Sequence, residues 1–151
     1  MKALHVEDIM TRQVVSVQSD HSIHLAAGLM ELKHIRHLPV LEGRRLVGLI
    51  THRDLVRAQA ALLCKPYDVA DDAAMSIPVA QIMCRNVWTV SPLARVLEAT
   101  QIVLDHKFGC LPVVEDKMLV GIVTEVDFLR CLVEGLAGRS EREDTDPILV
   151  G

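Results

Sequence analysis

The sequence predicts an α/β (α+β) fold built from two β-α-β-β-α repeats, which are related by a pseudo-two-fold axis and packed through their sheets. Three observations predict this fold. Three separate motifs recur at a constant offset of 73 residues. Within each copy the apolar positions change between helical and strand spacing. Hydrophobic residues make up 50% of the 151-residue chain and aromatic residues only 3%, so we expect an aliphatic core of strands packed on helices.

The repeat keeps one register, without a gap, through all three motifs. The recurring segments are VEDIMTR at 6–12 and VAQIMCR at 79–85, LPV at 38–40 and 111–113, and LVGLIT at 46–51 and LVGIVT at 119–124. Asp54 and Arg57 return as Asp127 and Arg130. A shared register through separate motifs indicates two copies of one structural unit.

Each copy is expected to open with a short helical turn and a short strand, followed by a helix. In the first copy the turn covers 7–10, the strand covers 14–17, and the helix begins near Asp20, a residue type favoured at N-caps. The helical face then comprises Ile23, Ala26, Ala27 and Met30. The corresponding parts of the second copy are a turn at 80–83, a strand at 87–90, and a helical face of Val96, Ala99 and Val103.

Two strands and a second helix complete each copy. In the first copy the strands cover 38–41 and 46–51, and the polar turn 42–44 joins them. Asp54 opens a helix with Leu55, Ala58 and Leu62 on one face, and Asp127 opens its counterpart. One copy alone is too small for a secure core. The expected organisation is therefore repeat 1 at 1–64, a linker at 65–78, repeat 2 at 79–137 and a charged, loosely held tail at 138–151.

Composition excludes several classes of protein. The net charge of −4 and the pI near 5.9 argue against binding to nucleic acid. No uncharged apolar run approaches the roughly 18–20 residues that span a bilayer, and the first residues do not resemble a signal peptide. The four cysteines have no metal-site spacing. These observations favour a cytoplasmic protein with free thiols and no membrane contact.

The strand ends at Thr51 and Thr124 carry the chemistry of the predicted sites. Each is followed by a helix, whose first N–H groups suit an anion such as phosphate. The Thr51 hydroxyl adds a donor, and the Asp54 carboxylate, one turn later, can accept hydrogen bonds from two ribose hydroxyls. Gly121, Thr124 and Asp127 repeat the arrangement of Gly48, Thr51 and Asp54. Helix capping is the alternative role for each pair, and its recurrence with the glycine favours a ligand.

The three repeated motifs, V-x-x-I-M, L-P-V and G-h-h-T-x-x-D (h, apolar), resemble those of the cystathionine beta-synthase (CBS) domain, here as a tandem pair over residues 6–135. The resemblance implies a cleft-bearing regulatory module, usually a homodimer, that catalyses nothing. It also implies a regulatory ligand, which is an adenine nucleotide (AMP, ADP or ATP) or an adenosyl compound such as S-adenosylmethionine. An unidentified regulated protein would complete such an energy-sensing system.

The resemblance implies that each site combines residues of both repeats, with apolar side chains on either side of the base. Ligand-binding site 1 would comprise Thr51, Arg53, Asp54, Met83, Trp88, Gly109 and Cys110. Ligand-binding site 2 would comprise Met10, Val15, Arg36, His37, Thr124, Val126 and Asp127. Arg53 can pair with a phosphate, whereas Glu125 would repel one, and so we expect site 1 to bind phosphorylated ligands more tightly.

Other residues leave alternatives open. Of the seven histidines, only His34 and His37 lie close together near a predicted site, without a carboxylate in a known ligand pattern, and no metal site is predicted. Trp88 serves either core packing or base stacking. Cys110 has no His-Asp relay, so no catalytic residue is assigned. Arg12 and Arg85 are either solvated or directed at phosphate.

A dimerisation or scaffolding module with empty clefts, or with a non-adenosyl ligand, is the alternative function. An enzyme lacks an acid–base pair and a glycine-rich phosphate loop.

Overall fold

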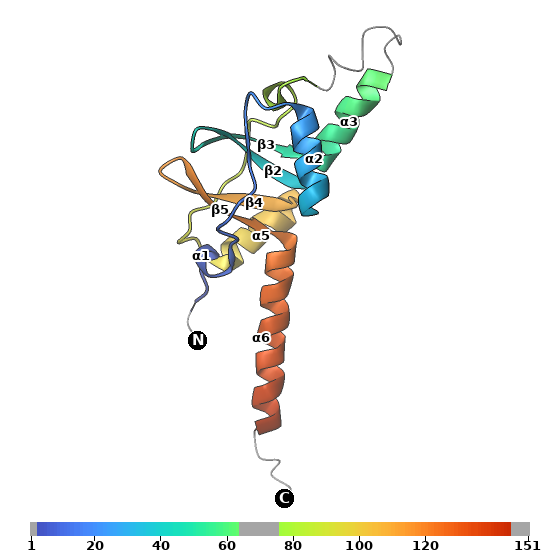
Figure 1. Cartoon of the computed structure of the whole chain (residues 1–151). Helices are drawn as coiled ribbons and strands as arrows, with labels where there is room; N and C mark the ends of the chain where they lie inside the picture. The colour runs from blue at the N-terminus through green and yellow to red at the C-terminus, as the bar shows by residue number, and fades with distance from the viewer. Residues whose placement is uncertain (1–2, 64–75, 146–151) are drawn as a thin grey trace, which may run out of the picture.

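The elements of the first repeat return in the same order in the second. The computed structural model describes residues 3–63 and 76–145 (Figure 1). The elements of the first half are α1 (Val6–Ile9), β1 (Val17–Gln18), α2 (Ile23–Lys33), β2 (His37–Glu42), β3 (Arg45–Thr51) and α3 (His52–Leu63). Those of the second are η1 (Val79–Gln81), α5 (Val96–His106), β4 (Cys110–Glu115), β5 (Met118–Thr124) and α6 (Glu125–Thr145). Most of the predicted linker, and residues 146–151 of the predicted tail, lie outside the described residues.

The strands of both repeats form one five-stranded sheet in the order β1-β2-β3-β5-β4. β2 pairs with β3, and β4 with β5, in antiparallel register, and each pair has an irregularity at the same place, after Val40 and after Val113. The repeats join where Arg45 of β3 pairs with Met118 of β5. The predicted fold class, two β-α-β-β-α repeats joined through their sheets, is confirmed.

The opening turns, residues 6–10 and 79–83, are exchanged between the repeats. Val79 and Met83 are buried in the core of the first repeat, with Leu38 and Ile50, whereas Val6 is buried in the core of the second. The backbone next to each turn pairs with the same strand of the other repeat. Thr11 and Ile122 exchange two hydrogen bonds of 2.9 and 3.0 Å, and Cys84 and Leu49 exchange two of 2.9 Å. Each repeat therefore completes the core of the other.

The repeated glycines make room for this exchange. A Cβ atom at Gly48 would lie 2.5 Å from Sδ of Met83, and one at Gly121 would lie 2.6 Å from Sδ of Met10. Backbone carbonyls of Cys84 and Thr11 would be 3.0 and 3.1 Å away. Any side chain at either position would displace a methionine of an opening turn, which is why the strand motif contains glycine in both copies.

Several predicted boundaries differ from the observed ones. The predicted strand 14–17 is reduced to β1, and the predicted strand 87–90 to a single bridge between Val90 and Val113. The prediction of Asp20 as N-cap is wrong, because residues 18–21 form a turn and the Ser22 hydroxyl accepts the bond from the Leu25 N–H at 3.2 Å. In α3 Leu55 is buried and Ala58 is half-buried, while the side chain of Leu62 lies outside the description.

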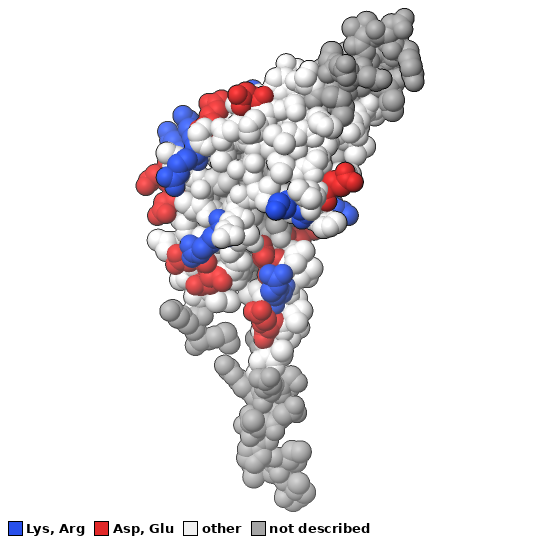
Figure 2. All heavy atoms as spheres, viewed as in Figure 1, with Lys and Arg blue, Asp and Glu red and all other residues white. Residues whose placement is uncertain are grey.

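The last helix is longer than expected. α6 continues past Gly138 to Thr145, over part of the predicted loosely held tail, because the segment Glu125–Thr145 contains no proline that would break a helix. Figure 1 shows α3 and α6 extending from opposite ends of the body. Acidic and basic side chains are interspersed on the face shown in Figure 2. Among the described helices, none combines the length and apolar character needed to cross a bilayer.

Candidate functional site

Each strand-to-helix junction closes on itself through a threonine and an aspartate. Oδ2 of Asp54 accepts hydrogen bonds from the Thr51 N–H at 2.8 Å and from its hydroxyl at 2.9 Å, and the Asp54 N–H donates to the Thr51 hydroxyl at 3.2 Å. Oδ2 of Asp127 accepts the matching bonds from Thr124 at 2.8 and 3.2 Å. The first junction is a complete capping box, and at the second the aspartate makes the same two bonds; we call both junctions capping boxes. The aspartates therefore do cap the helices, as the alternative role predicted. Capping uses Oδ2 of each carboxylate, so Oδ1 has fewer hydrogen-bond donors of the protein around it.

A cleft of about 530 Å³ lies between the first repeat and the capping box at Asp127. We call it the Asp127 cleft. Six of the seven residues predicted for site 2 line it together: Val15, Arg36, His37, Thr124, Val126 and Asp127. Asp127 is only 6% exposed, and its Oδ1 lies 3.5 Å from a guanidinium nitrogen of Arg130. A buried carboxylate at the wall of a cleft is an acceptor in place for a ligand hydroxyl.

Met10, the seventh residue predicted for site 2, does not line this cleft. Its thioether occupies the space above Gly121 and packs on the core of the second repeat. Nine residues not predicted for site 2 line the cleft as well, and they follow the first opening turn, precede β2 or β4, or lie near the capping box. These residues are Thr11, Gln13, Val14, His34, Ile35, Gly109, Ile122, Glu125 and Arg130.

A second cleft, of about 490 Å³, lies at the other strand-to-helix junction. We call it the Arg53 cleft. Four of the seven residues predicted for site 1 line it: Thr51, Arg53, Gly109 and Cys110. The other lining residues are Arg36, His37, Leu49, His52, Lys107, Phe108 and Glu125. Lys107 could have been found from the repeat itself, since it is the counterpart of His34 and both adopt a left-handed backbone, with φ of 56° and 53°.

Three residues predicted for site 1 lie outside the lining of the Arg53 cleft. Asp54 is half-buried and engaged in its capping box. Met83 packs above Gly48, as Met10 does above Gly121. Trp88 is 49% exposed and lies 4.4 Å from the ring of His106 and 6.1 Å from the ring of Phe108. Trp88 thus packs beside Phe108, which lines the cleft, and does not line the cleft itself.

The two clefts share a wall made of Arg36, His37, Gly109 and Glu125. The His37 ring lies in the space that a side chain at Gly109 would need. Burial lowers the pKa of His37 below its ordinary value, and Arg36 lowers it further, while the Glu125 and Asp54 carboxylates oppose this shift. His37 is therefore held toward its neutral form at the point where the clefts meet.

The charges that line the clefts differ. The Arg53 cleft has three permanent cations, Arg36, Arg53 and Lys107, against the single carboxylate of Glu125. The Asp127 cleft has Arg36 and Arg130 against Glu125 and Asp127, on a wall that also contains valine and isoleucine. The first is suited to an anion, and the second to a ligand with little negative charge.

The remaining candidates have simple structural roles. Burial raises the pKa of the Cys110 thiol to about 12, so it stays protonated at neutral pH. Arg12 and Arg85 donate to backbone carbonyls of the opening turns, at Glu7 and Ala80. The three cysteines within the described residues, Cys84, Cys110 and Cys131, are free. No His, Cys, Asp or Glu residues in the described ranges gather in threes as a metal site requires.

The fold and the clefts define a tandem-repeat module with ligand-sized cavities between its repeats. The model of the CBS domain matches residues 6–61 and 79–134, so the chain belongs to the CBS domain family, with two copies. The CBS domain-containing protein YhcV of Bacillus subtilis is 30% identical over 118 residues, which are 78% of each chain. Inosine-5'-monophosphate dehydrogenase of Korarchaeum cryptofilum is 34% identical over 80% of this chain but only 23% of that enzyme.

Solved structures share the whole arrangement. A Vibrio cholerae structure described as an acetoin utilization protein (AcuB) matches with a TM-score of 0.80 and 33% identity, over 97% of this chain and 100% of that one. The CBS domain pair of MJ0100, in complex with 5'-methylthioadenosine and S-adenosyl-L-methionine, has a TM-score of 0.74 and 28% identity, over 89% and 99%. CBSX2, in complex with AMP, has a TM-score of 0.74 and 27% identity, over 86% and 96%.

Proposed function

We propose that this chain is a regulatory module that binds adenine nucleotides or other adenosyl compounds in the Arg53 and Asp127 clefts. The observation that carries the proposal is the convergence of both repeats on each cleft. Thr124 and Asp127 lie at one wall of the Asp127 cleft and Thr51 at one wall of the Arg53 cleft, and residues of the other repeat lie opposite. Solved structures that share this fold are complexes with 5'-methylthioadenosine and S-adenosyl-L-methionine in one case and with AMP in the other.

In the Asp127 cleft, the apolar wall of Val14, Val15 and Ile35 suits the faces of an adenine ring. Asp127 would then accept a ribose hydroxyl. Because Oδ2 already accepts two bonds in the capping box, Oδ1 is the oxygen that would receive the ligand, and the selectivity for ribose would come from one strong hydrogen bond rather than two. A bond to a charged acceptor is worth about 1.5–3 kcal/mol.

The two clefts would take ligands of different charge. The cations of the Arg53 cleft favour AMP, ADP or ATP, whose phosphates would approach Arg53 and the N-terminus of α3. The carboxylates of the Asp127 cleft favour an adenosyl group without phosphate, such as 5'-methylthioadenosine or the cationic S-adenosylmethionine. This division extends the expectation that site 1 binds phosphorylated ligands more tightly.

The output would be regulatory and not catalytic. Ligands that bind between the repeats can change their relative position only through a difference in affinity between two states. We propose that the chain works as a homodimer and that this change alters its affinity for another protein. The alternative is a dimerisation or scaffolding module whose clefts hold no adenosyl ligand.

Calorimetric titration with AMP, ATP, 5'-methylthioadenosine and S-adenosylmethionine tests the proposal. Arg53→Ala should weaken AMP binding about tenfold or more, because one charged hydrogen bond is lost. Arg57→Ala is the matched control, since Arg57 is exposed one turn further along α3 and lines neither cleft. If no adenosyl compound raises the melting temperature at millimolar concentration, the scaffolding alternative replaces this proposal. A ligand at 100 times its Kd would add about 2.7 kcal/mol of stability.

A further inference from the structure

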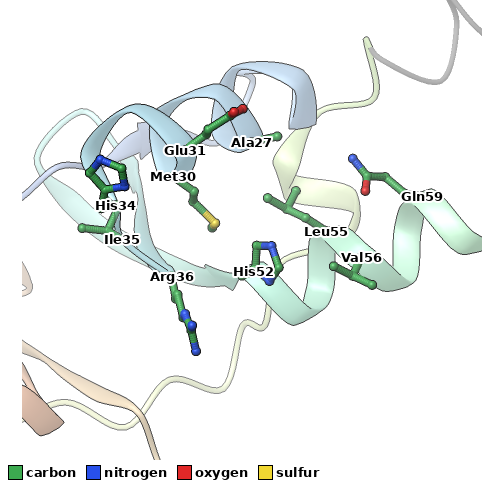
Figure 3. Close-up of a pocket in the computed structure, with 10 residues that line it drawn as sticks. All are labelled: Ala27, Met30, Glu31, His34, Ile35, Arg36, His52, Leu55, Val56 and Gln59. Atoms are coloured by element: carbon green, nitrogen blue, oxygen red, sulfur yellow. The ribbon is translucent and has the colours of Figure 1, made fainter.

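Outside the two clefts the surface has further hollows, and two of them differ in charge. One, of about 520 Å³, lies between α2 and α3, where Met30 and Leu55 point toward each other (Figure 3). Its lining includes one carboxylate, Glu31, and one permanent cation, Arg36. The other, of about 280 Å³, lies where the two repeats meet, and we call it the seam hollow. The described residues that line the seam hollow include three permanent cations and no carboxylate.

The cations of the seam hollow come from three separate segments of the two repeats. Arg45 begins β3 of the first repeat, at the pair with Met118 that joins the repeats in the sheet. Lys117 lies in the turn between β4 and β5, and Arg85 follows the second opening turn. All three side chains are exposed and therefore accessible to a ligand. A group bound between them would contact both repeats at once.

No carboxylate neutralises these cations within the described residues. The two ion pairs of that part of the chain lie elsewhere, at Asp8 and at Asp127. Arg85 donates one hydrogen bond, of 3.2 Å, to the Ala80 carbonyl, which leaves most of its N–H donors available. Three acidic residues of the neighbouring hairpins do not line the hollow: Glu42, Glu115 and Asp116. In a chain with a net charge of −4, three cations gathered without a partner form a local positive potential that an anion would relieve.

The internal repeat shows which of these cations recurs. At an offset of 73 residues, the counterparts of Lys117 and Arg85 are also cations, whereas the counterpart of Arg45 is Met118. The equivalent place on the other side of the seam therefore has two cations where the seam hollow has three. Since a strand of the same fold begins with methionine there, the fold itself does not require an arginine at the start of β3. Arg45 is thus the residue that distinguishes the two sides by charge.

We infer that the seam hollow binds a compact polyanion, such as a short polyphosphate or a small polycarboxylate, which bridges the two repeats. Its volume is below the roughly 300–1,000 Å³ of pockets for drug-sized ligands, so it suits a small ion and not a nucleotide. Arg45 and Arg85 match phosphate or carboxylate oxygens with paired N–H groups, Lys117 adds a point charge, and Thr89 adds a hydroxyl donor.

This site is separate from the two clefts. It shares none of its described lining residues with either of them. The seam hollow lies at the start of β3 and Thr51 lies at its end, and seven strand residues span roughly 20 Å. The inference therefore does not depend on a nucleotide in the Arg53 or Asp127 cleft.

Calorimetric titration with pyrophosphate and with citrate, at one fixed ionic strength, tests the site. Arg45→Met introduces the residue type of the equivalent position and should weaken binding of the preferred anion about tenfold or more, because a charged hydrogen bond is lost. Arg44→Met is the matched control, since it removes the same charge from the next residue, which does not line the hollow. It should change the affinity by about twofold at most, because exposed charges are screened. Tighter binding of pyrophosphate would assign the site to phosphates, and tighter binding of citrate to carboxylates.

Lys117→Asn is a second variant that should fold at least as well as the natural chain. Lys117 has a positive φ of 66°, a conformation that asparagine adopts more readily than lysine. The variant removes a cation from the hollow and should also weaken binding of the anion. Circular dichroism verifies that each variant folds.

Three results would overturn the inference. Equal losses from Arg44→Met and Arg45→Met would mean that the anion responds only to overall surface charge. A loss caused by Arg53→Ala would locate the anion in the Arg53 cleft, and the absence of binding of either anion at millimolar concentration would mean that the hollow holds none. AMP titration of the Arg45→Met protein tests the clefts separately, because this substitution leaves their lining unchanged.

Discussion

The Arg53 and Asp127 clefts have the same backbone and different charges. Each lies at a strand-to-helix junction where an aspartate carboxylate accepts a 2.8 Å hydrogen bond from a threonine N–H, and each is completed by residues of the opposite repeat. Yet His52 and Arg53 of the first junction correspond to Glu125 and Val126 of the second. The residues that close the junction are preserved within the chain, whereas the residues that would meet a ligand have diverged. The fold thus requires the threonine and the aspartate of each junction, whereas the two residues between them are free to set the charge that a ligand meets.

One pair of equivalent positions, at and beside the shared wall, makes the same point. His37 and Cys110 are counterparts at the start of β2 and β4. Burial disfavours the charged form of both, since it lowers the pKa of His37 and raises that of Cys110. Only His37 has carboxylates near it that oppose this shift. The two sides of the wall therefore respond differently to pH and to thiol reagents.

The largest expected effect is on thiol reactivity. Cys84 is exposed, whereas the Cys110 thiol, with its pKa near 12, has roughly a thousandth of the thiolate of an ordinary cysteine at neutral pH. Iodoacetamide should therefore modify Cys84 far faster than Cys110, as measured by mass spectrometry of the labelled peptides. Equal rates at the two residues would show that the wall opens to solvent readily.

Filling the space beneath an opening turn should have the next largest effect. Gly121→Val places side-chain atoms where Sδ of Met10 lies, and overpacking should cost about 1–3 kcal/mol in thermal or urea unfolding. Gly48→Val should cost a similar amount at Met83. Gly28→Ala is the control, because nothing lies near that glycine in α2, and it should stabilise by about 0.5–1 kcal/mol. Met10→Ala should recover part of the loss in the Gly121→Val background, and its failure to do so would argue against the exchange.

Exchanging the divergent residues should transfer the ligand preference. Arg53→Val combined with Val126→Arg moves a cation from one cleft to the other without altering net charge. We expect phosphorylated nucleotides to bind the Arg53 cleft about tenfold more weakly and the Asp127 cleft more tightly, since one charged hydrogen bond changes place. Calorimetry with AMP measures both. An unchanged profile would mean that backbone N–H groups, and not Arg53, hold the phosphate.

The smallest effect concerns stability at mildly acidic pH. Because the pKa of His37 is lower in the folded chain than the ordinary value of 6.5, the unfolded chain binds the proton more readily. The contribution of neutral His37 to stability is therefore complete above pH 6.5 and is lost as the pH falls from 6.5 toward the folded pKa. His37→Gln should lose less stability than the natural chain between pH 7.5 and 5.5. Parallel pH dependences for the two proteins would contradict this.

Much of the architecture could be predicted from the sequence, because an internal repeat is a local, readable pattern. The motif containing Thr51 and Asp54 predicted both junctions, and six of seven residues expected at the Asp127 cleft lie together there. The methionines were placed less well. Met10 and Met83 were expected to contact the base, but nothing in the sequence shows that Gly48 and Gly121 leave a space that a thioether fills first. The prediction that Trp88 lines a cleft is wrong, because its ring packs against His106. This contact could not be predicted, since it depends on α5 ending at His106.

The exchange of opening turns has a consequence for the chain as it leaves the ribosome. Val79 and Met83 belong to the core of the first repeat, so a nascent chain that ends at residue 63 still lacks two of the side chains that cover Ile50 and Leu38. The second repeat, in turn, needs Val6, which precedes it in the chain by more than seventy residues (Val79 is its counterpart at an offset of 73). The first repeat therefore has a complete core only once residues 79–83 have been made, and a gene encoding only one repeat, without the opening turn of the other, would express a protein with an uncovered apolar face.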